Sequence, residues 1–266
     1  MFALIVYLCF FLATIGSLTY LAVDSPFRKE LKQYLDLRAE LLSSQVLDPL
    51  NRSVGVLQSI VSIAQASESQ EEASRMLRSI FSTVDDVVIS GGIWPKPFSV
   101  DPYVKYKGLF FNRATDGNID QLYSWNNPEA GGYDSEVWYV SGMEEPSGSI
   151  FWSPVYVDSF TQIQMITVTS PYYVNGEFAG VATVDLSLQS LTELISLHAE
   201  RYQLGVSLKD SFGSTITEHN FRLRDGAYVS KYTFGDFNWK LDVVNSHRLV
   251  DDDVYDLVMS VEKGIL

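Results

Sequence analysis

The sequence lacks the residue patterns on which most enzyme mechanisms depend. It contains a single cysteine, Cys9, so no internal disulfide is expected and the cysteine content identifies no redox compartment. There is no glycine-rich phosphate loop, no Gly-x-Ser-x-Gly segment and no His-Glu-x-x-His segment. The histidines, His198, His219 and His247, are scattered without metal-ligand spacing. We therefore expect a non-catalytic protein with no cofactor and no metal site.

Charge is also missing from the first 23 residues, although the rest of the chain is rich in it. At about 1.5 Å per residue, a helix over residues 1–23 would extend roughly 35 Å, enough to cross the hydrocarbon core of a bilayer. A cleaved signal peptide is the competing interpretation, but no basic residue precedes the apolar run and no clear Ala-x-Ala site precedes Asp24. The pattern favours a transmembrane helix over residues 1–23.

The basic residues near this segment do not fix its orientation. Arg28, Lys29 and Lys32 follow it and none precedes it, which by the positive-inside rule favours a cytoplasmic position for the rest of the chain. The same stretch also contains Asp24 and Glu30, which makes the bias mild.

The chain is acidic overall, with a net charge of −14 and a pI near 4.5. This balance argues against nucleic-acid binding and attracts cations to the surface. In the run Asp251–Asp253, successive carboxylates on a helix point in different directions, so we interpret the run as a helix N-terminal turn and not as a cation site. That helix, over residues 249–266, is expected to lead to a second transmembrane segment.

Helical spacing is typical of residues 24–83. Apolar residues recur at alternating three- and four-residue intervals, at Leu47, Leu50, Val54, Leu57, Val61 and Ala64. The pair Asp48-Pro49 indicates that the helix kinks or restarts there. Residues Ser69–Glu72 form a capping box that begins another helix toward Thr83. Two interpretations of this apolar stripe stay open: it packs against the chain's own sheet, or it packs against a second copy in a homodimer. Each interpretation can hold for a different stretch of the helix.

After Val84, short β-rich runs alternate with turn residues. The predicted strands cover residues 87–89, 109–113, 164–173, 179–186, 204–208, 227–234 and 239–244. Asn175-Gly176 predicts a type I′ hairpin, and Asp225-Gly226 predicts a second turn. A helix over residues 188–202 separates two similar β units.

Aromatic and acidic residues gather between residues 133 and 185, at Tyr133, Glu136, Trp138, Tyr139, Trp152, Tyr156, Asp158 and Asp185. Aromatic faces attract a cation and carboxylates accept charge-assisted hydrogen bonds, so the pattern suits a small cationic ligand. The same residue types also fill cores and cap turns. Asp185 is the sharpest signal, because it lies inside an apolar strand where an unpaired carboxylate is costly.

Five segments resemble a known family. In order they are Gly-Gly-Ile-Trp-Pro-Lys-Pro-Phe (91–98), Leu-Phe-Phe-Asn-Arg (109–113), Gly-Tyr-Asp-Ser-Glu-Val-Trp-Tyr (132–139), Trp-Ser-Pro-Val-Tyr-Val-Asp (152–158) and Gly-Val-Ala-Thr-Val-Asp-Leu-Ser-Leu (180–188). Over about residues 25–266 the chain is similar to the double-Cache sensor domains of bacterial chemoreceptors, histidine kinases and diguanylate cyclases.

The resemblance implies an α+β fold in which a transmembrane helix continues into a long helix followed by two PAS-like antiparallel units. It divides the chain into a long helical segment (24–83), a membrane-distal ligand-binding unit (84–187) and a linker helix with a membrane-proximal unit (188–248). It also implies a receptor in the bacterial inner membrane with its sensor in the periplasm, which overrides the charge bias near residues 1–23.

Site residues follow from the amino-acid-binding branch of this family, which uses an Arg two residues before a Trp-Tyr pair, then a Tyr-x-Asp and a later Asp. By that resemblance, ligand contacts are expected at Tyr133, Trp138, Tyr139, Tyr156, Asp158 and Asp185. The Arg position is occupied by Glu136, which would repel a ligand carboxylate and favour a cation. We expect a small amine, such as a biogenic amine, polyamine or quaternary ammonium, unless Glu136 points into solvent.

Other interpretations stay open. An amino acid or small carboxylate is the main alternative, with Arg113 or Lys96 supplying the positive charge. A second is a structural or interaction module with an empty site. A metal-dependent hydrolase using the same carboxylates is disfavoured by the missing histidine ligands.

Overall fold

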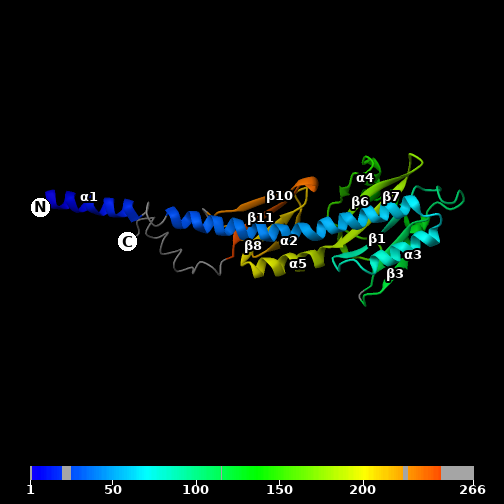
Figure 1. Cartoon of the computed structure of the whole chain (residues 1–266), viewed down its shortest axis with the longest axis horizontal. Helices are drawn as coiled ribbons and strands as arrows, with labels where there is room; N and C mark the ends of the chain where they lie inside the picture. Colours follow the sequence, from blue (N-terminus) through cyan, green and yellow to red (C-terminus); the bar gives the residue numbers. More distant parts are fainter. Residues whose placement is uncertain (1, 20–24, 115, 224–226, 247–266) are drawn as a thin grey trace.

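Two antiparallel sheets lie along one long helix in the computed structural model, which describes residues 2–19, 25–114, 116–223 and 227–246 (Figure 1). The helices are α1 (Phe2–Thr19), α2 (Ser25–Ala66), α3 (Gln70–Phe81), α4 (Val137–Glu144) and α5 (Leu188–Arg201). The strands are β1 (Val88–Pro95), β2 (Leu109–Arg113), β3 (Ile119–Leu122), β4 (Phe151–Trp152), β5 (Tyr156–Val157), β6 (Gln164–Val174), β7 (Glu177–Ser187), β8 (Leu204–Lys209), β9 (Thr215–His219), β10 (Ser230–Phe234) and β11 (Trp239–Asn245). The predicted α+β class is confirmed.

The N-terminal helix α1 is apolar, uncharged and exposed along its described side chains. Within the described part of the chain, however, no helix is both long enough and apolar enough to cross a membrane. At about 1.5 Å per residue, α1 extends roughly 27 Å, slightly less than the ~30 Å hydrocarbon core of a bilayer. The prediction of a transmembrane helix over residues 1–23 is therefore not supported, and residues 1 and 20–23 of that segment lie outside the described residues.

Helix α2 contains 42 residues and continues through Pro49 without restarting. Asp48 forms an ion pair with Arg52 one turn later, so it does not act as a helix cap. Leu50 and Leu57 are fully buried, and the other residues of the predicted apolar stripe pack against the same core. The stripe between residues 47 and 64 therefore covers the chain's own sheets.

The first half of α2 is fastened to the second sheet by polar contacts. Arg38 is buried and donates hydrogen bonds to the carbonyl oxygen of Tyr202 at 2.7 Å and to Asn245 Oδ1. Asp36 accepts a hydrogen bond of 2.7 Å from Ser230 Oγ. These bonds fix α2 to α5, β10 and β11, so the helix contacts both sheets along its length.

Helix α3 begins where the capping box predicts. Ser69 is its N-cap, and the Ser69 side chain accepts a hydrogen bond from the backbone N–H of Glu72 at 3.2 Å. The Glu72 carboxylate accepts a return bond from the backbone N–H of Glu68 instead of Ser69. The helix then covers β1 and β2.

The first sheet, called the large sheet below, has the strand order β3-β2-β1-β7-β6-β4, with β5 also paired to β6. Its longest hairpin joins β6 to β7 through Asn175 and Gly176, whose φ values of 54° and 82° confirm the predicted type I′ turn. Strands β3, β4 and β5 are short and were not predicted, because they lack a clear alternation of apolar and polar residues.

The second, small sheet has the order β10-β11-β8-β9 and packs on α5 and on the first half of α2. The prediction covered β8, β10 and β11 but not β9. The predicted turn at residues 225–226 and the predicted helix over residues 249–266 lie outside the described residues.

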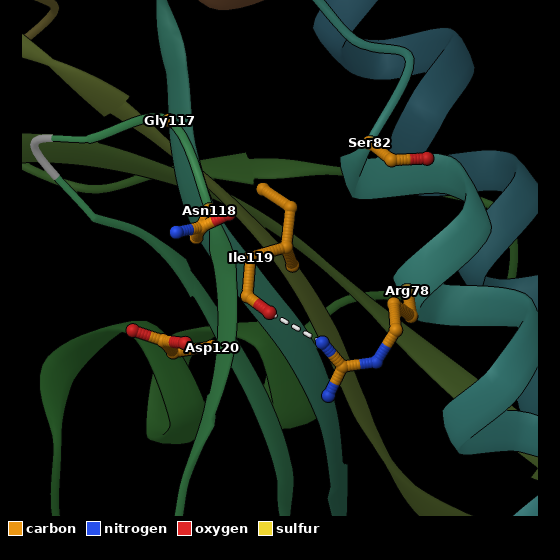
Figure 2. Close-up of a pocket in the computed structure, with 6 residues that line it drawn as sticks. All are labelled: Arg78, Ser82, Gly117, Asn118, Ile119 and Asp120. Carbon is orange, nitrogen blue, oxygen red and sulfur yellow. Dashed lines mark hydrogen bonds between the residues drawn. The ribbon is translucent and has the colours of Figure 1, made fainter.

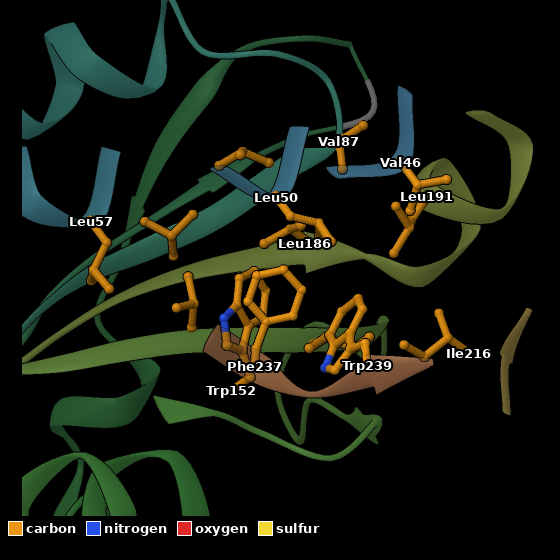
Figure 3. Close-up of a cluster of buried hydrophobic side chains, with 14 of the residues drawn as sticks. Val46, Leu50, Leu57, Val87, Trp152, Leu186, Leu191, Ile216, Phe237 and Trp239 are labelled. Atoms are coloured by element: carbon orange, nitrogen blue, oxygen red, sulfur yellow. The ribbon is translucent and has the colours of Figure 1, made fainter. Parts of the chain in front are cut away.

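The two sheets meet at an aromatic contact (Figure 3). Trp152 of β4 lies with its ring centroid 5.2 Å from that of Trp239 in β11 and 5.4 Å from that of Phe237. Trp152 is 4% exposed and Trp239 is fully buried, and both belong to the same apolar core as Leu186 and Leu191. One continuous core therefore joins the two sheets.

Removing this contact should destabilise the whole fold. Trp152→Ala is expected to lower the free energy of unfolding by about 3–5 kcal/mol, because it leaves a cavity between the sheets. Tyr103→Ala, at a side chain that is 93% exposed, should change it by less than about 0.5 kcal/mol. Denaturant unfolding measures both, and equal effects of the two substitutions would contradict a shared core.

Candidate ligand-binding site

The large sheet has two different faces. Ala182, Val184 and Leu186 of β7 belong to the apolar core beneath α2. Val181 belongs instead to an aromatic cluster on the side of α4. Because side chains alternate along a strand, Thr183 and Asp185 lie on the α4 face with Val181. This face carries most of the residues that the sequence singled out.

An aromatic cluster fills the part of this face around Trp94 and Val181, which are paired across β1 and β7. Its buried members are Trp94, Tyr106, Phe110, Trp125, Tyr133, Trp138, Tyr139 and Val181. Trp94 lies at its centre, with its ring centroid 4.9 Å from Trp138 and 5.2 Å from Tyr133. The rings contact one another closely, which indicates a packed wall of the site.

Two of the predicted tyrosines have different surroundings within this wall. The Tyr133 hydroxyl donates a hydrogen bond of 2.7 Å to the carbonyl oxygen of Pro95, so it is already paired. The Tyr139 hydroxyl is buried and has no hydrogen-bond partner among the described residues. Burial raises the pKa of Tyr139, and the charged group that adds to this effect is Asp134. Tyr139 therefore faces a different region from Asp185.

Asp185 is the most enclosed carboxylate of the site, at 4% exposure. Its Oδ2 accepts a hydrogen bond from Ser90 Oγ and its Oδ1 accepts one from Thr167 Oγ1, both at 2.7 Å. Burial raises the pKa of Asp185 to about 6, and the charge of Asp158 acts in the same direction, while the two hydroxyl donors act against it. The predicted need for partners is confirmed, but the partners are neutral hydroxyls.

Tyr156 extends the hydrogen-bonded group. Its hydroxyl lies 2.7 Å from Thr167 Oγ1. Since the Thr167 hydroxyl proton is used toward Asp185, the Tyr156 hydroxyl donates to Thr167. Burial raises the pKa of Tyr156, and the nearby acids Asp185, Asp158 and Glu136 add to the effect. Tyr156 therefore lies among all three predicted carboxylates.

Glu136 and Asp158 complete this acidic group. Glu136 precedes α4 and is partly buried, and its side chain forms no cap hydrogen bond. Burial, followed by repulsion from Asp158, raises the pKa of Glu136. The Glu136 side chain is therefore not simply turned into solvent. Glu136, Asp158 and Asp185 are called the acidic group below.

Asp158 also has a structural role. Its Oδ2 accepts hydrogen bonds from the backbone N–H of Thr161 at 2.6 Å and from Thr161 Oγ1 at 2.7 Å. A third bond comes from the backbone N–H of Phe160 at 3.2 Å. These bonds hold the turn between β5 and β6, so Asp158 combines a turn cap with a position beside Glu136.

Arg113 and Lys96, the residues expected to pair with a carboxylate ligand, do not lie at the acidic group. Arg113 donates to the carbonyl oxygens of Phe81 at 2.9 Å and Val84 at 3.0 Å, on the opposite face of the sheet. Lys96 is exposed. Among the charged groups that shift the pKa values of Glu136 and Asp185, only acids occur. In the described part of the chain, the acidic group therefore has no cationic partner.

A shallow hollow of about 500 Å³ lies on the α3 side of the sheet edge (Figure 2). It is lined by Arg78, Ser82 and residues 117–120, and Arg78 donates a hydrogen bond to the carbonyl oxygen of Ile119. The hollow is open to solvent and shares no residue with the acidic group.

A family model described as "Methyl-accepting chemotaxis protein-like, first PDC sensor domain" matches residues 73–193. This segment of the chain is therefore similar to a PDC sensor domain. The matched segment contains the aromatic wall and the whole acidic group. No curated protein matches the chain closely enough to count as a relative.

Solved structures similar to this chain include ligand-binding domains of chemoreceptors. One titled "Methyl-accepting Chemotaxis protein X" has a TM-score of 0.65 at 13% identity and covers 82% of this chain and 98% of its own. The ligand-binding domain of the Campylobacter jejuni chemoreceptor Tlp3 with L-valine has a TM-score of 0.57 at 14% identity, covering 85% and 96%. That of the Pseudomonas aeruginosa PAO1 amino acid chemoreceptor PctC with GABA has 0.58 at 15%, covering 81% and 99%. The chain thus has the double-Cache sensor fold that its motifs resemble.

Two residues of the candidate site were not predicted from the sequence. Ser90 and Thr167 hold Asp185, yet hydroxyl residues inside strands carry no distinctive signal. Only the register, which places Ser90 and Thr167 directly opposite Asp185, identifies them.

The raised pKa of Asp185 predicts a pH-dependent stability. Its folded pKa is about 6 and its ordinary value is near 4, so the folded chain retains this proton between pH 4 and 6 while the unfolded chain loses it. The stabilisation is complete below pH 4 and is lost as the pH rises through 6, in total about 3 kcal/mol. Between pH 4 and 6.5, the free energy of unfolding of Asp185→Asn should therefore rise by about 2 kcal/mol relative to that of the unmodified chain.

Denaturant unfolding at several pH values tests this expectation. Glu177→Gln, at an exposed turn, is the matched control and should follow the unmodified chain at every pH. A difference between Asp185→Asn and the unmodified chain that stays constant with pH would contradict the assignment.

Proposed function

We propose that the chain is the sensor portion of a bacterial transmembrane signalling receptor and that its large-sheet unit recognises a small amine-containing ligand. The observation that carries the ligand assignment is the acidic group, in which Glu136, Asp158 and Asp185 lie close together without a described cation. Buried like charges repel one another, and a bound ammonium relieves both the repulsion and the desolvation.

The aromatic wall supports this assignment. Trp138 lies directly after Glu136 and Val137 at the start of α4 and is 4% exposed. Its ring belongs to the wall that borders the acidic group on the same sheet face. An aromatic face beside carboxylates suits an alkyl or quaternary ammonium, because the ring attracts the cation while the carboxylates accept its N–H bonds.

An amino acid is the second candidate ligand. It is favoured by the similar structures, in which Tlp3 holds L-valine and PctC holds GABA. An amino acid also carries an ammonium group, which the acidic group suits equally well. Its carboxylate, however, would need a cation near Glu136, and Arg113 is committed on the other face. We therefore favour amines without a carboxylate.

Signalling requires attachment and a partner copy. We propose that residues 1–23 anchor the chain in the inner membrane, with the sensor in the periplasm. We further propose that two copies associate through α2, where Leu31, Tyr34, Leu37 and Leu41 form an exposed apolar stripe. The residues between them that face the core, Leu35 and Ala39, are buried, so the exposed stripe lies on the side of α2 away from the small sheet. A ligand then signals only if it prefers one arrangement of the paired helices.

Reversing the charge at Glu136 should change the preferred ligand from an amine to an amino acid. Glu136→Arg is expected to weaken binding of a primary amine by at least about tenfold and to strengthen binding of L-amino acids, because the new guanidinium pairs with their carboxylate. Titration calorimetry against a panel of amines and amino acids measures both changes.

Glu144→Arg is the matched control. It makes the same charge change at an exposed position of the same helix, so its effects should be small. If the unmodified chain binds ordinary L-amino acids more tightly than the corresponding amines, the amine assignment is wrong.

A further inference from the structure

A polar row crosses the α4 face of the large sheet. Residues that lie directly opposite one another on neighbouring strands are Asp120 and Asn112, Asn112 and Ser90, Ser90 and Asp185, and Asp185 and Thr167. Side chains opposite each other in antiparallel strands lie on the same face. Ser90, Asn112 and Asp120 therefore extend the acidic group across β1, β2 and β3. The opposite face of this sheet is apolar.

Asn112 is the unexplained member of this row. Its Oδ1 is shielded from solvent and accepts no hydrogen bond from any described residue. A buried acceptor without a donor destabilises a fold by roughly 1–3 kcal/mol. Neighbouring Phe111 faces α3 through its contact with Phe81, which places Asn112 on the ligand side of β2. The free acceptor therefore lies two strands from Asp185, on the same face.

The outer end of the row is also acidic. Asp120 is exposed and lies opposite Asn112 on the edge strand β3. Its carboxylate points away from Arg78, on the side of the strand opposite to α3 (Figure 2). In the described part of the chain, Asp120 forms no ion pair. The acidic group on one side of the row and Asp120 on the other therefore both suit a hydrogen-bond donor or a cation as a partner.

We propose that the ligand is a linear diamine, with one ammonium held by the acidic group and the other donating a hydrogen bond to Asn112 Oδ1 near Asp120. This inference rests on the proposed amine-sensing function and names its ligand class. Neighbouring strands lie about 4.8 Å apart, so Asp185 and Asn112 are separated by roughly 10 Å. A chain of about four to six carbons between two amino groups covers this distance.

The test compares cadaverine with pentylamine, which differs from it mainly in lacking the second amino group. The 266-residue chain should bind cadaverine at least about tenfold more tightly than pentylamine, because the second ammonium gains a charge-assisted bond. In Asn112→Leu this preference should fall to within about twofold while pentylamine affinity is retained. In Asn112→Asp the preference should increase.

Two controls separate the effects of fold and overall charge. Asn112→Leu removes an unpaired buried acceptor, so its melting temperature without ligand should equal or exceed that of the unmodified chain. Asp120→Asn should weaken cadaverine binding more than pentylamine binding, whereas Glu177→Gln makes the same charge change at a distant exposed turn and should affect neither.

The outcomes distinguish the two proposals. Equal binding of cadaverine and pentylamine, or a cadaverine preference that persists in Asn112→Leu, would overturn the diamine inference and leave amine sensing intact. If neither compound binds, both proposals fail.

Discussion

The buried carboxylate of Asp185 is the group around which the site is organised. It lies in a strand that is apolar on its other face, and hydroxyls from both neighbouring strands hold its oxygens. Hydroxyls orient a carboxylate but do not neutralise it, and the nearest charges belong to further acids. A bound cation, as in the proposed function, would stabilise this group, because burial penalises the ionised form and like charges repel. The raised pKa of Asp185 has the same two causes, burial and the repulsion between like charges.

The rest of the fold supports this arrangement. Helix α2 covers the opposite face of the large sheet and is also bonded to the small sheet through Asp36 and Arg38, so movement in one unit is resisted by the other. The segment from Trp152 to Asp158 joins the inter-sheet aromatic contact to the site, and Ser153 is paired with the backbone of Thr167. The site is therefore built on rigid strands that also carry the contact between the units.

Much of this architecture was predictable from local patterns. The hairpin at Asn175-Gly176, the cap at Ser69 and the carboxylate within β7 each depend on a few neighbouring residues. Ser90, Asn112 and Thr167 were not predictable, because their role arises only when strands distant in sequence come into register. Glu136 was identified by resemblance, but its partial burial and its proximity to Asp158 required the fold.

The central claim is that the acidic group receives a cation beside Asp185, and proton release on binding tests it most directly. Pentylamine is fully charged at pH 6, where Asp185 is about half protonated. Its binding should displace up to about half a proton per ligand, measured by calorimetry at pH 6 in two buffers of different ionisation enthalpy. The release should disappear in Asp185→Asn. Amine binding without proton release, or with proton uptake, would contradict the account.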